Sequence, residues 1–179
     1  MTGKVRIIGG HWRSRLISFP RLPDLRPTAD RIRETLFNWL GQDLTGLDCL
    51  DLFSGSGALG FEAASRRANQ VVMLENNAKA YQALQHNKHE LQAEQIELIK
   101  EDALHFLHRD VRQFDVIFVD PPYRLELLSQ ILTILPLHLK ENGLVYLESN
   151  RQPMLGSEWQ IKRQSRAGNV FYQLVELHG

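Results

Sequence analysis

The alternation of short apolar runs with helical segments is the feature that most constrains the fold of this chain. Nearly continuous apolar runs predict strands that are covered on both faces, and strands separated by helices are typical of a parallel, doubly wound sheet. The predicted strands are residues 48–53, 70–75, 96–100, 115–119, 144–148, 160–164 and 170–176, and the predicted helices are residues 28–40, 58–67, 78–92, 103–109 and 125–139.

The last two predicted strands are joined only by the tight connection 166–169, so we expect them to pair antiparallel as a hairpin. The predicted fold class is therefore α/β, with a doubly wound, seven-stranded Rossmann-like sheet that is mostly parallel and carries an antiparallel C-terminal hairpin strand. Pro136 should kink or end the helix that contains it. A length of 179 residues suits one domain over residues 1–179, with residues 1–25 as a basic N-terminal arm.

Composition excludes several classes of protein. The chain is 43% hydrophobic and 23% charged, which is typical of a globular domain. Its single cysteine, Cys49, excludes an internal disulfide and fits a reducing cytosol. No apolar stretch approaches the roughly 20 residues that a membrane span needs, and the N-terminus lacks the apolar core of a signal peptide. These features predict a cytoplasmic protein that does not act in a membrane.

The zero net charge conceals an asymmetry along the chain. Residues 1–33 hold eight Lys or Arg and two acids, a net charge of +6, whereas the remaining residues hold 13 basic and 19 acidic side chains, a net charge of −6. A basic arm on an acidic body indicates a polyanionic partner. A basic surface that is merely solvated is the alternative.

A glycine-rich turn follows the strand predicted at residues 48–53. Gly55, Gly57 and Gly60 form G-x-G-x-x-G before a helix, and such glycines let the backbone turn sharply and approach a nucleotide. Glu75 ends the next strand, where an acid can accept hydrogen bonds from ribose hydroxyls. This pattern suits both NAD enzymes and methyl-transferring enzymes that use S-adenosylmethionine, and a tight strand-to-helix turn is the structural alternative.

Two further acids help to separate the cofactors. Asp51 stands four residues before Gly55, where a carboxylate favours the amino and sulfonium cations of S-adenosylmethionine and disfavours a pyrophosphate. Asp102 ends the third strand and can accept a hydrogen bond from an adenine amino group. It can also cap the helix that follows, and both roles can hold.

The tetrapeptide Asp120-Pro121-Pro122-Tyr123 follows the strand predicted at residues 115–119, on the side of the sheet where doubly wound folds bind ligands. The prolines fix φ and remove two backbone donors, so their carbonyls and the Asp120 carboxyl form a rigid set of acceptors. Acceptors beside an aromatic ring suit a planar base with an exocyclic amine, which they can position and stabilise as charge develops. The alternative is a proline-stiffened turn.

Together these motifs resemble the S-adenosylmethionine-dependent amino-methyltransferases, whose signature is (D/N/S)-P-P-(Y/F/W). Residues 6–10, 25–28 and 30–40 are similar, more narrowly, to the bacterial 16S ribosomal RNA guanine-N2 methyltransferases of the D type, and the resemblance covers nearly the whole chain. The arm departs from the usual W-R-G-R-K-L of that family at Ser14 and Leu16, and Asp24 stands where a glycine is expected.

The resemblance implies methyl transfer from S-adenosylmethionine, leaving S-adenosylhomocysteine, to the N2 amine of one guanine in 16S ribosomal RNA. It implies a substrate within the small ribosomal subunit or an assembly intermediate. We also expect a monomeric enzyme, and no metal, because the histidines show no metal-ligand pattern with cysteine. The predicted catalytic residues are Asp120, Pro121, Pro122 and Tyr123. The predicted cofactor-binding residues are Asp51, Phe53, Gly55, Gly57, Glu75, Asp102 and Thr28. The predicted RNA-binding residues are Arg6, Arg13, Arg15, Arg26, Arg31 and Arg33, and Trp12 either stacks on a base or covers the core edge.

Three other functions remain open from the sequence. A DNA adenine-N6 or cytosine-N4 methyltransferase would use the same tetrapeptide, although the chain has no obvious sequence-reading domain. A non-catalytic RNA-binding or assembly factor would need only the basic arm. An NAD dehydrogenase is supported by the glycine turn alone, and Asp51 and the 120–123 tetrapeptide oppose it.

Overall fold

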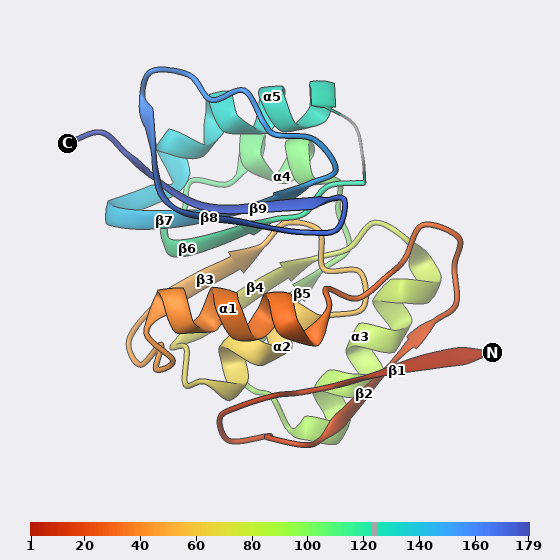
Figure 1. Cartoon of the computed structure of the whole chain (residues 1–179). Helices are drawn as coiled ribbons and strands as arrows, with labels where there is room; N and C mark the ends of the chain where they lie inside the picture. Colours follow the sequence, from red (N-terminus) through yellow and green to blue (C-terminus); the bar gives the residue numbers. More distant parts are fainter. Residues whose placement is uncertain (123–124) are drawn as a thin grey trace.

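The computed structural model describes residues 1–122 and 125–179, and its centre is a seven-stranded sheet with the order β5-β4-β3-β6-β7-β9-β8 (Figure 1). The strands are β3 (Asp48–Asp51), β4 (Gln70–Leu74), β5 (Ile96–Ile99), β6 (Phe114–Val119), β7 (Leu139–Ser149), β8 (Trp159–Ala167) and β9 (Val170–Leu177). The first five strands of that order are parallel, and β9 pairs antiparallel with both β7 and β8. The predicted fold class and the antiparallel C-terminal hairpin are confirmed.

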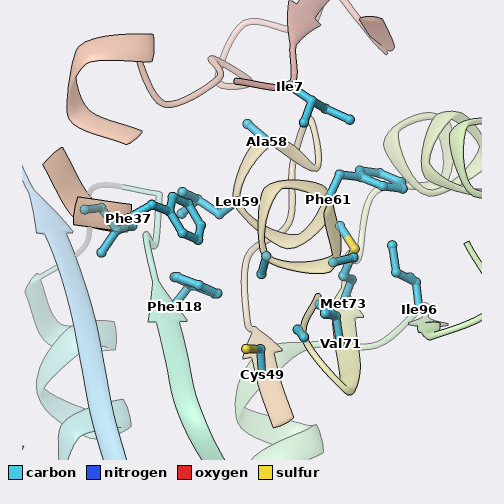
Figure 2. Packing of buried hydrophobic residues seen from close by; sticks show 14 of the residues in the cluster. Ile7, Phe37, Cys49, Ala58, Leu59, Phe61, Val71, Met73, Ile96 and Phe118 are labelled. Carbon is cyan, nitrogen blue, oxygen red and sulfur yellow. The ribbon is translucent and has the colours of Figure 1, made fainter. Parts of the chain in front are cut away.

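Helices cover both faces of this sheet (Figure 1). They are α1 (Asp30–Leu40), α2 (Ala58–Ser65), α3 (Ala78–Leu91), α4 (Ala103–Arg109), α5 (Leu125–Ile134) and the short 3-10 helix η1 (Leu135–His138). Because strand neighbours point to opposite faces, Cys49 belongs to the core beneath α1, α2 and α3, whereas Leu50 belongs to the core beneath α4 and α5. Figure 2 shows the first core, with Phe61 of α2 close to Met73 of β4.

Most predicted elements agree with the structure to within two residues at each end. Strand β8 ends three residues later than predicted, and the larger difference is at the boundary between α5 and β7. The residues predicted as one helix over 125–139 form α5 and then η1, because Pro136 cannot continue an α-helix. Strand β7 therefore begins at Leu139, five residues before the predicted start. Its pairing with β6 shifts register between Phe114 and Val116, which absorbs the extra residues.

Residues 1–25, predicted as a basic N-terminal arm, are folded onto the domain. They contain an antiparallel hairpin of β1 (Thr2–Arg6) and β2 (Leu16–Pro20), which lies against α3. The Ser18 amide donates to Asn87 Oδ1 at 3.1 Å, and Asn87 Nδ2 donates back to the Ser18 carbonyl at 2.8 Å. Trp12 is 6% exposed and packs in the first core, so it covers the core edge and is not available to stack on a base.

A buried ion-pair network joins this hairpin to α1 and α2. Glu62 is fully buried, and its carboxylate accepts from the amides of Ile8 at 3.0 Å and Gly9 at 2.8 Å. The same carboxylate accepts from Arg33 Nη1 at 3.1 Å and from Arg66 Nε at 3.0 Å. All its acceptor positions are used, so the network satisfies the charge that burial would otherwise make costly.

Within residues 1–122 and 125–179, no helix is both long enough and apolar enough to cross a membrane.

Candidate active site

The predicted site residues gather where the carboxyl ends of β3 and β6 lie side by side. From β3 the chain continues to β4 on one side and later crosses to β6 on the other, so the topological switch point lies between β3 and β6. Asp51 ends β3 and pairs in register with Phe118 of β6, two residues before Asp120. The negative charge of Asp51 contributes to the raised pKa of Asp120, so the two carboxyls are within electrostatic reach.

The glycine turn has a packing side and an open side. A Cβ at Gly57 would lie 2.6 Å from the Phe61 ring, and one at Gly60 would lie 2.6 Å from the Met73 sulfur, so these two glycines allow α2 to pack closely. At Gly55, where φ is +52°, the nearest atom to such a Cβ is Leu25 Cγ at 3.9 Å. The backbone at Gly55 is therefore the part of the turn that a ligand can approach.

Asp51 is 2% exposed, and the amide of Gly60 donates to its Oδ2 at 3.1 Å. Burial, with a smaller contribution from the nearby charge of Glu75, raises the pKa of Asp51 to about 7. In the part of the chain that the structure describes, no cation pairs with this buried carboxyl, so it gains most from a positively charged ligand. The sulfonium and ammonium groups of S-adenosylmethionine supply that charge, so the residues present fit this cofactor.

Glu75 lies beside the open side of the turn. Its Oε2 accepts from the Gly55 amide at 2.8 Å and its Oε1 accepts from the Asn77 amide at 3.0 Å. Each carboxylate oxygen can accept a second hydrogen bond, so contact with ribose hydroxyls remains compatible with these bonds. Phe53, which follows β3, is half-buried against the second core.

Asp102 caps α4, because its Oδ1 accepts from the His105 amide at 3.1 Å. The capping interpretation is confirmed. Its side chain is exposed, and contact with an adenine amino group stays a prediction.

The tetrapeptide begins directly after β6. Asp120 is half-buried, Pro121 is buried and Pro122 is exposed, while the predicted stacking residue Tyr123 lies outside the described residues. Burial first, and the adjacent Glu148 second, hold the pKa of Asp120 well above its ordinary range.

Glu148 of β7 is a site residue that the sequence reasoning missed. Val119 pairs with Leu147, so Asp120 and Glu148 follow at the next position of two parallel strands, and their side chains are hydrogen-bonded. The Thr28 hydroxyl donates to Glu148 Oε2 at 3.4 Å, which ties the segment before α1 to the same carboxyl. The available signal was an acid ending a predicted strand at the ligand-binding edge.

Among the six arginines predicted to contact RNA, five have exposed side chains and one does not. The exposed arginines are Arg6, Arg13, Arg15, Arg26 and Arg31.

The prediction is wrong for Arg33, which is 1% exposed. Its guanidinium donates to the Thr28 carbonyl at 3.0 Å, to the Arg6 carbonyl at 2.9 Å and to Glu62, and it also pairs with Asp30. Arg33 lies next to the apolar face of α1, and its side chain is buried because it forms an ion pair with the buried Glu62.

A surface hollow of about 450 Å³ lies along α1 and is separate from the carboxyl end of the sheet. Arg13, Glu34, Asn38 and Arg66 line it, and it includes none of the residues predicted to bind the cofactor. Among the described residues, no group of three His, Cys, Asp or Glu side chains could hold a metal ion.

Comparison with known proteins identifies the family. The model of the family described as Conserved hypothetical protein 95 matches residues 5–176. The Ribosomal RNA small subunit methyltransferase D of Escherichia coli (strain K12) is 40% identical over 180 residues, which are 98% of this chain and 91% of the relative. The chain belongs to the ribosomal RNA small subunit methyltransferase D family. Its Haemophilus influenzae relative of the same name is 41% identical over 182 residues, covering 97% of this chain and 94% of the relative.

Solved structures agree with the methyltransferase D assignment. A putative methyltransferase from Escherichia coli superposes with a TM-score of 0.88 at 40% identity, covering 98% of both chains. A guanine-N2 methyltransferase of 16S ribosomal RNA from Thermus thermophilus, solved with AdoMet and guanosine, has a TM-score of 0.74 at 21% identity and covers 99% of this chain and 50% of that one. At that identity the second likeness shows the shared fold alone.

Proposed function

We propose that this chain transfers the methyl group of S-adenosylmethionine to the exocyclic N2 amine of one guanine in 16S ribosomal RNA, giving N2-methylguanosine. The observation that carries the proposal is that Asp51 and the Asp120-Pro121 turn lie on neighbouring strands at the switch point of the sheet, in a chain that belongs to this family. The Asp51 carboxyl suits a cationic cofactor, and the Asp120 carboxyl with the Pro121 carbonyl suits an amine that donates hydrogen bonds.

On the cofactor side, Asp51 would hold the cationic end, and Glu75 the ribose, with the open backbone at Gly55 beside it. When bound, S-adenosylmethionine supplies an electrophilic methyl group attached to a sulfonium. The remaining residues proposed to contact it are Phe53, Gly57, Asp102 and Thr28.

On the substrate side, Asp120 and the Pro121 carbonyl accept hydrogen bonds from the amine. The nitrogen lone pair of guanine N2 is delocalised into the ring, so the amine is a weak nucleophile until its hydrogens are held by hydrogen-bond acceptors. Fixed acceptors position the nitrogen and stabilise the charge that develops on it. Pro122 stiffens the turn, and Tyr123 remains a proposed stacking residue.

The basic N-terminal region would hold the RNA backbone. Arg26 and Arg31 are exposed and lie two residues before and three residues after Thr28, whose hydroxyl donates to Glu148. Arg6, Arg13 and Arg15 extend the positive surface along the hairpin. Phosphate contacts of this kind lose affinity steeply with salt. A ribosomal RNA substrate would place the activity in the cytoplasm, on the small subunit or its assembly intermediate.

Transfer of a labelled methyl group to defined substrates tests this proposal. The substrates are small ribosomal subunits from cells that lack the modification, the free 16S RNA and a naked DNA duplex, and the product is identified by nucleoside analysis. We expect N2-methylguanosine at a single site, and Asp120→Ala should abolish it while calorimetry shows retained cofactor binding. N6-methyladenine or N4-methylcytosine in DNA would replace the proposed substrate with the DNA alternative. A fully active Asp120→Ala variant would refute the assigned role of Asp120.

A further inference from the structure

A second carboxyl stands directly beside the catalytic one. Asp120 and Glu148 follow the register pair Val119 and Leu147 at the carboxyl ends of β6 and β7. Two residues earlier on the same two strands, the rings of Phe118 and Tyr146 contact with centroids 6.4 Å apart. Because side chains alternate along a strand, Asp120 and Glu148 point to the same side as these rings, toward α1.

The described surroundings of the pair exclude water from much of it and offer it few donors. Glu148 is 8% exposed, and its carboxylate accepts a hydrogen bond from the Thr28 hydroxyl. Tyr146 is fully buried, and its hydroxyl has no hydrogen-bond partner among the residues that the structure describes. Tyr172 of β9 stands opposite Glu148 in the antiparallel pairing.

Among residues 1–122 and 125–179, no salt bridge neutralises the pair. Asp51 on β3 is negative when ionised, and it acts on Asp120 from the neighbouring strand. From α1, Arg33 reaches the Thr28 carbonyl, but its guanidinium is paired with Glu62 and Asp30.

Two adjacent carboxyls in a poorly solvated site cannot both ionise easily, since each charge disfavours the other. Burial and the neighbouring Glu148 raise the pKa of Asp120, and burial raises the pKa of Glu148. The two therefore titrate as a unit, in which one proton can be shared between the two carboxyls.

We propose that Glu148 is a positioning residue for methyl transfer. It shares one proton with Asp120, so the two carboxyls together carry one negative charge. The Asp120 carboxyl is thereby held in place to accept hydrogen bonds from the amine of the target base. The inference rests on the proposed function. It assigns to Glu148 no contact with substrate, only a hold on the residue that makes this contact.

The pH dependence follows from the sign of this coupling. The shared proton is present below the raised upper pKa of the pair and is lost as pH rises through it. Its loss puts two negative charges in contact, which pushes the Asp120 carboxyl out of place. The single-turnover rate of the wild-type protein should therefore fall on the alkaline side through that step.

Glu148→Gln tests the shared proton, because its amide can donate to an ionised Asp120 at every pH. We expect this variant to keep most of the neutral-pH rate and its affinity for S-adenosylmethionine, and to lose the alkaline fall. Glu148→Ala leaves Asp120 without that donor and should lose about tenfold or more in rate, since misplacement of a catalytic group is costly. Glu141→Gln is the matched control, as Glu141 is an exposed acid at the other end of β7.

A readout independent of activity is the titration of carbon-13-labelled carboxyl groups by NMR in the free protein. The wild-type spectrum should show a carboxyl step far above the ordinary range for Asp, and Glu148→Gln should remove the like charge and lower the pKa of Asp120. An alkaline fall that is identical in wild type and Glu148→Gln overturns the inference, and so does independent titration of both carboxyls in their ordinary range. If no substrate is methylated under any condition, the proposed function fails, whereas the NMR titration still decides whether the proton is shared.

Discussion

Asp51 gives cofactor binding a predictable dependence on pH. Burial raises the pKa of this carboxyl to about 7 in the free protein, so it is largely neutral at pH 6 and largely ionised at pH 8. A cationic cofactor binds the ionised form. Affinity for S-adenosylmethionine should therefore rise as pH rises through 7, and binding below pH 7 should release a proton.

The magnitude follows from the ionised fraction. With a pKa of about 7, roughly one molecule in eleven carries the charge at pH 6 and about ten in eleven carry it at pH 8. If only the ionised form binds, the dissociation constant changes about tenfold between these two pH values, which is about 1.4 kcal/mol.

Isothermal titration calorimetry at pH 6 and pH 8 measures this change, and buffers of different ionisation enthalpy count the protons released. Asp51→Asn is the control, because its amide oxygen can still accept from Gly60 and its side chain does not titrate. The amino group of the cofactor titrates equally with both proteins, so the difference between them isolates Asp51. The variant should bind more weakly than wild type at pH 8.

Equal wild-type affinity at the two pH values would refute the reasoning. A pH dependence in Asp51→Asn that matches wild type would do the same, because the titrating group would then be elsewhere. Circular dichroism at both pH values establishes that each protein is folded.

Three further predictions concern stability, measured by urea unfolding against Glu141→Gln. Glu62→Ala should lower the free energy of unfolding by about 3–5 kcal/mol, since it leaves buried guanidiniums without their carboxylate, and a loss under 1 kcal/mol would contradict that account. Gly57→Ala should cost more than about 1 kcal/mol, because φ is +87° and a Cβ would meet Phe61, and an unchanged midpoint would exclude this strain. Asn77→Ala should cost about 1 kcal/mol through loss of the α3 cap, whereas Asn77→Asp should be nearly neutral, and equal losses would argue against capping.

Local patterns predicted the sheet because its parallel strands are covered on both faces and therefore read as apolar runs. The carboxyl-end residues followed from the same pattern, since Asp51 lies in the second half of such a run, Glu75 ends one and Asp120 directly follows one. Strand β7 was harder, because residues 139–143 contain Lys140, Glu141 and Asn142, which do not read as a strand. The strand reaches back to Leu139 because Leu139 pairs with Phe114 of β6 across a register shift, which is a tertiary interaction.

Long-range partners account for what the sequence could not give. Arg33 is an ordinary helical arginine until Glu62, 29 residues away, supplies a buried carboxylate. Trp12 joins the core only because the hairpin folds back over α2, where Ser65 Oγ accepts from its amide at 2.9 Å. Glu148 lies beside Asp120 because β6 and β7 are neighbours in the sheet, and the sequence of either strand alone does not predict the strand order.

The central claim is that the Asp51–Asp120 site methylates guanine N2 in small-subunit RNA. The most direct test expresses this chain in a bacterial strain that lacks its own methyltransferase of this family, and then measures N2-methylguanosine in purified 16S RNA by mass spectrometry. The account predicts that the wild-type chain restores one N2-methylguanosine per 16S RNA at a single position and that Asp120→Ala, expressed to the same level, does not. Absence of restoration by the folded wild-type chain, or equal restoration by Asp120→Ala, would contradict it.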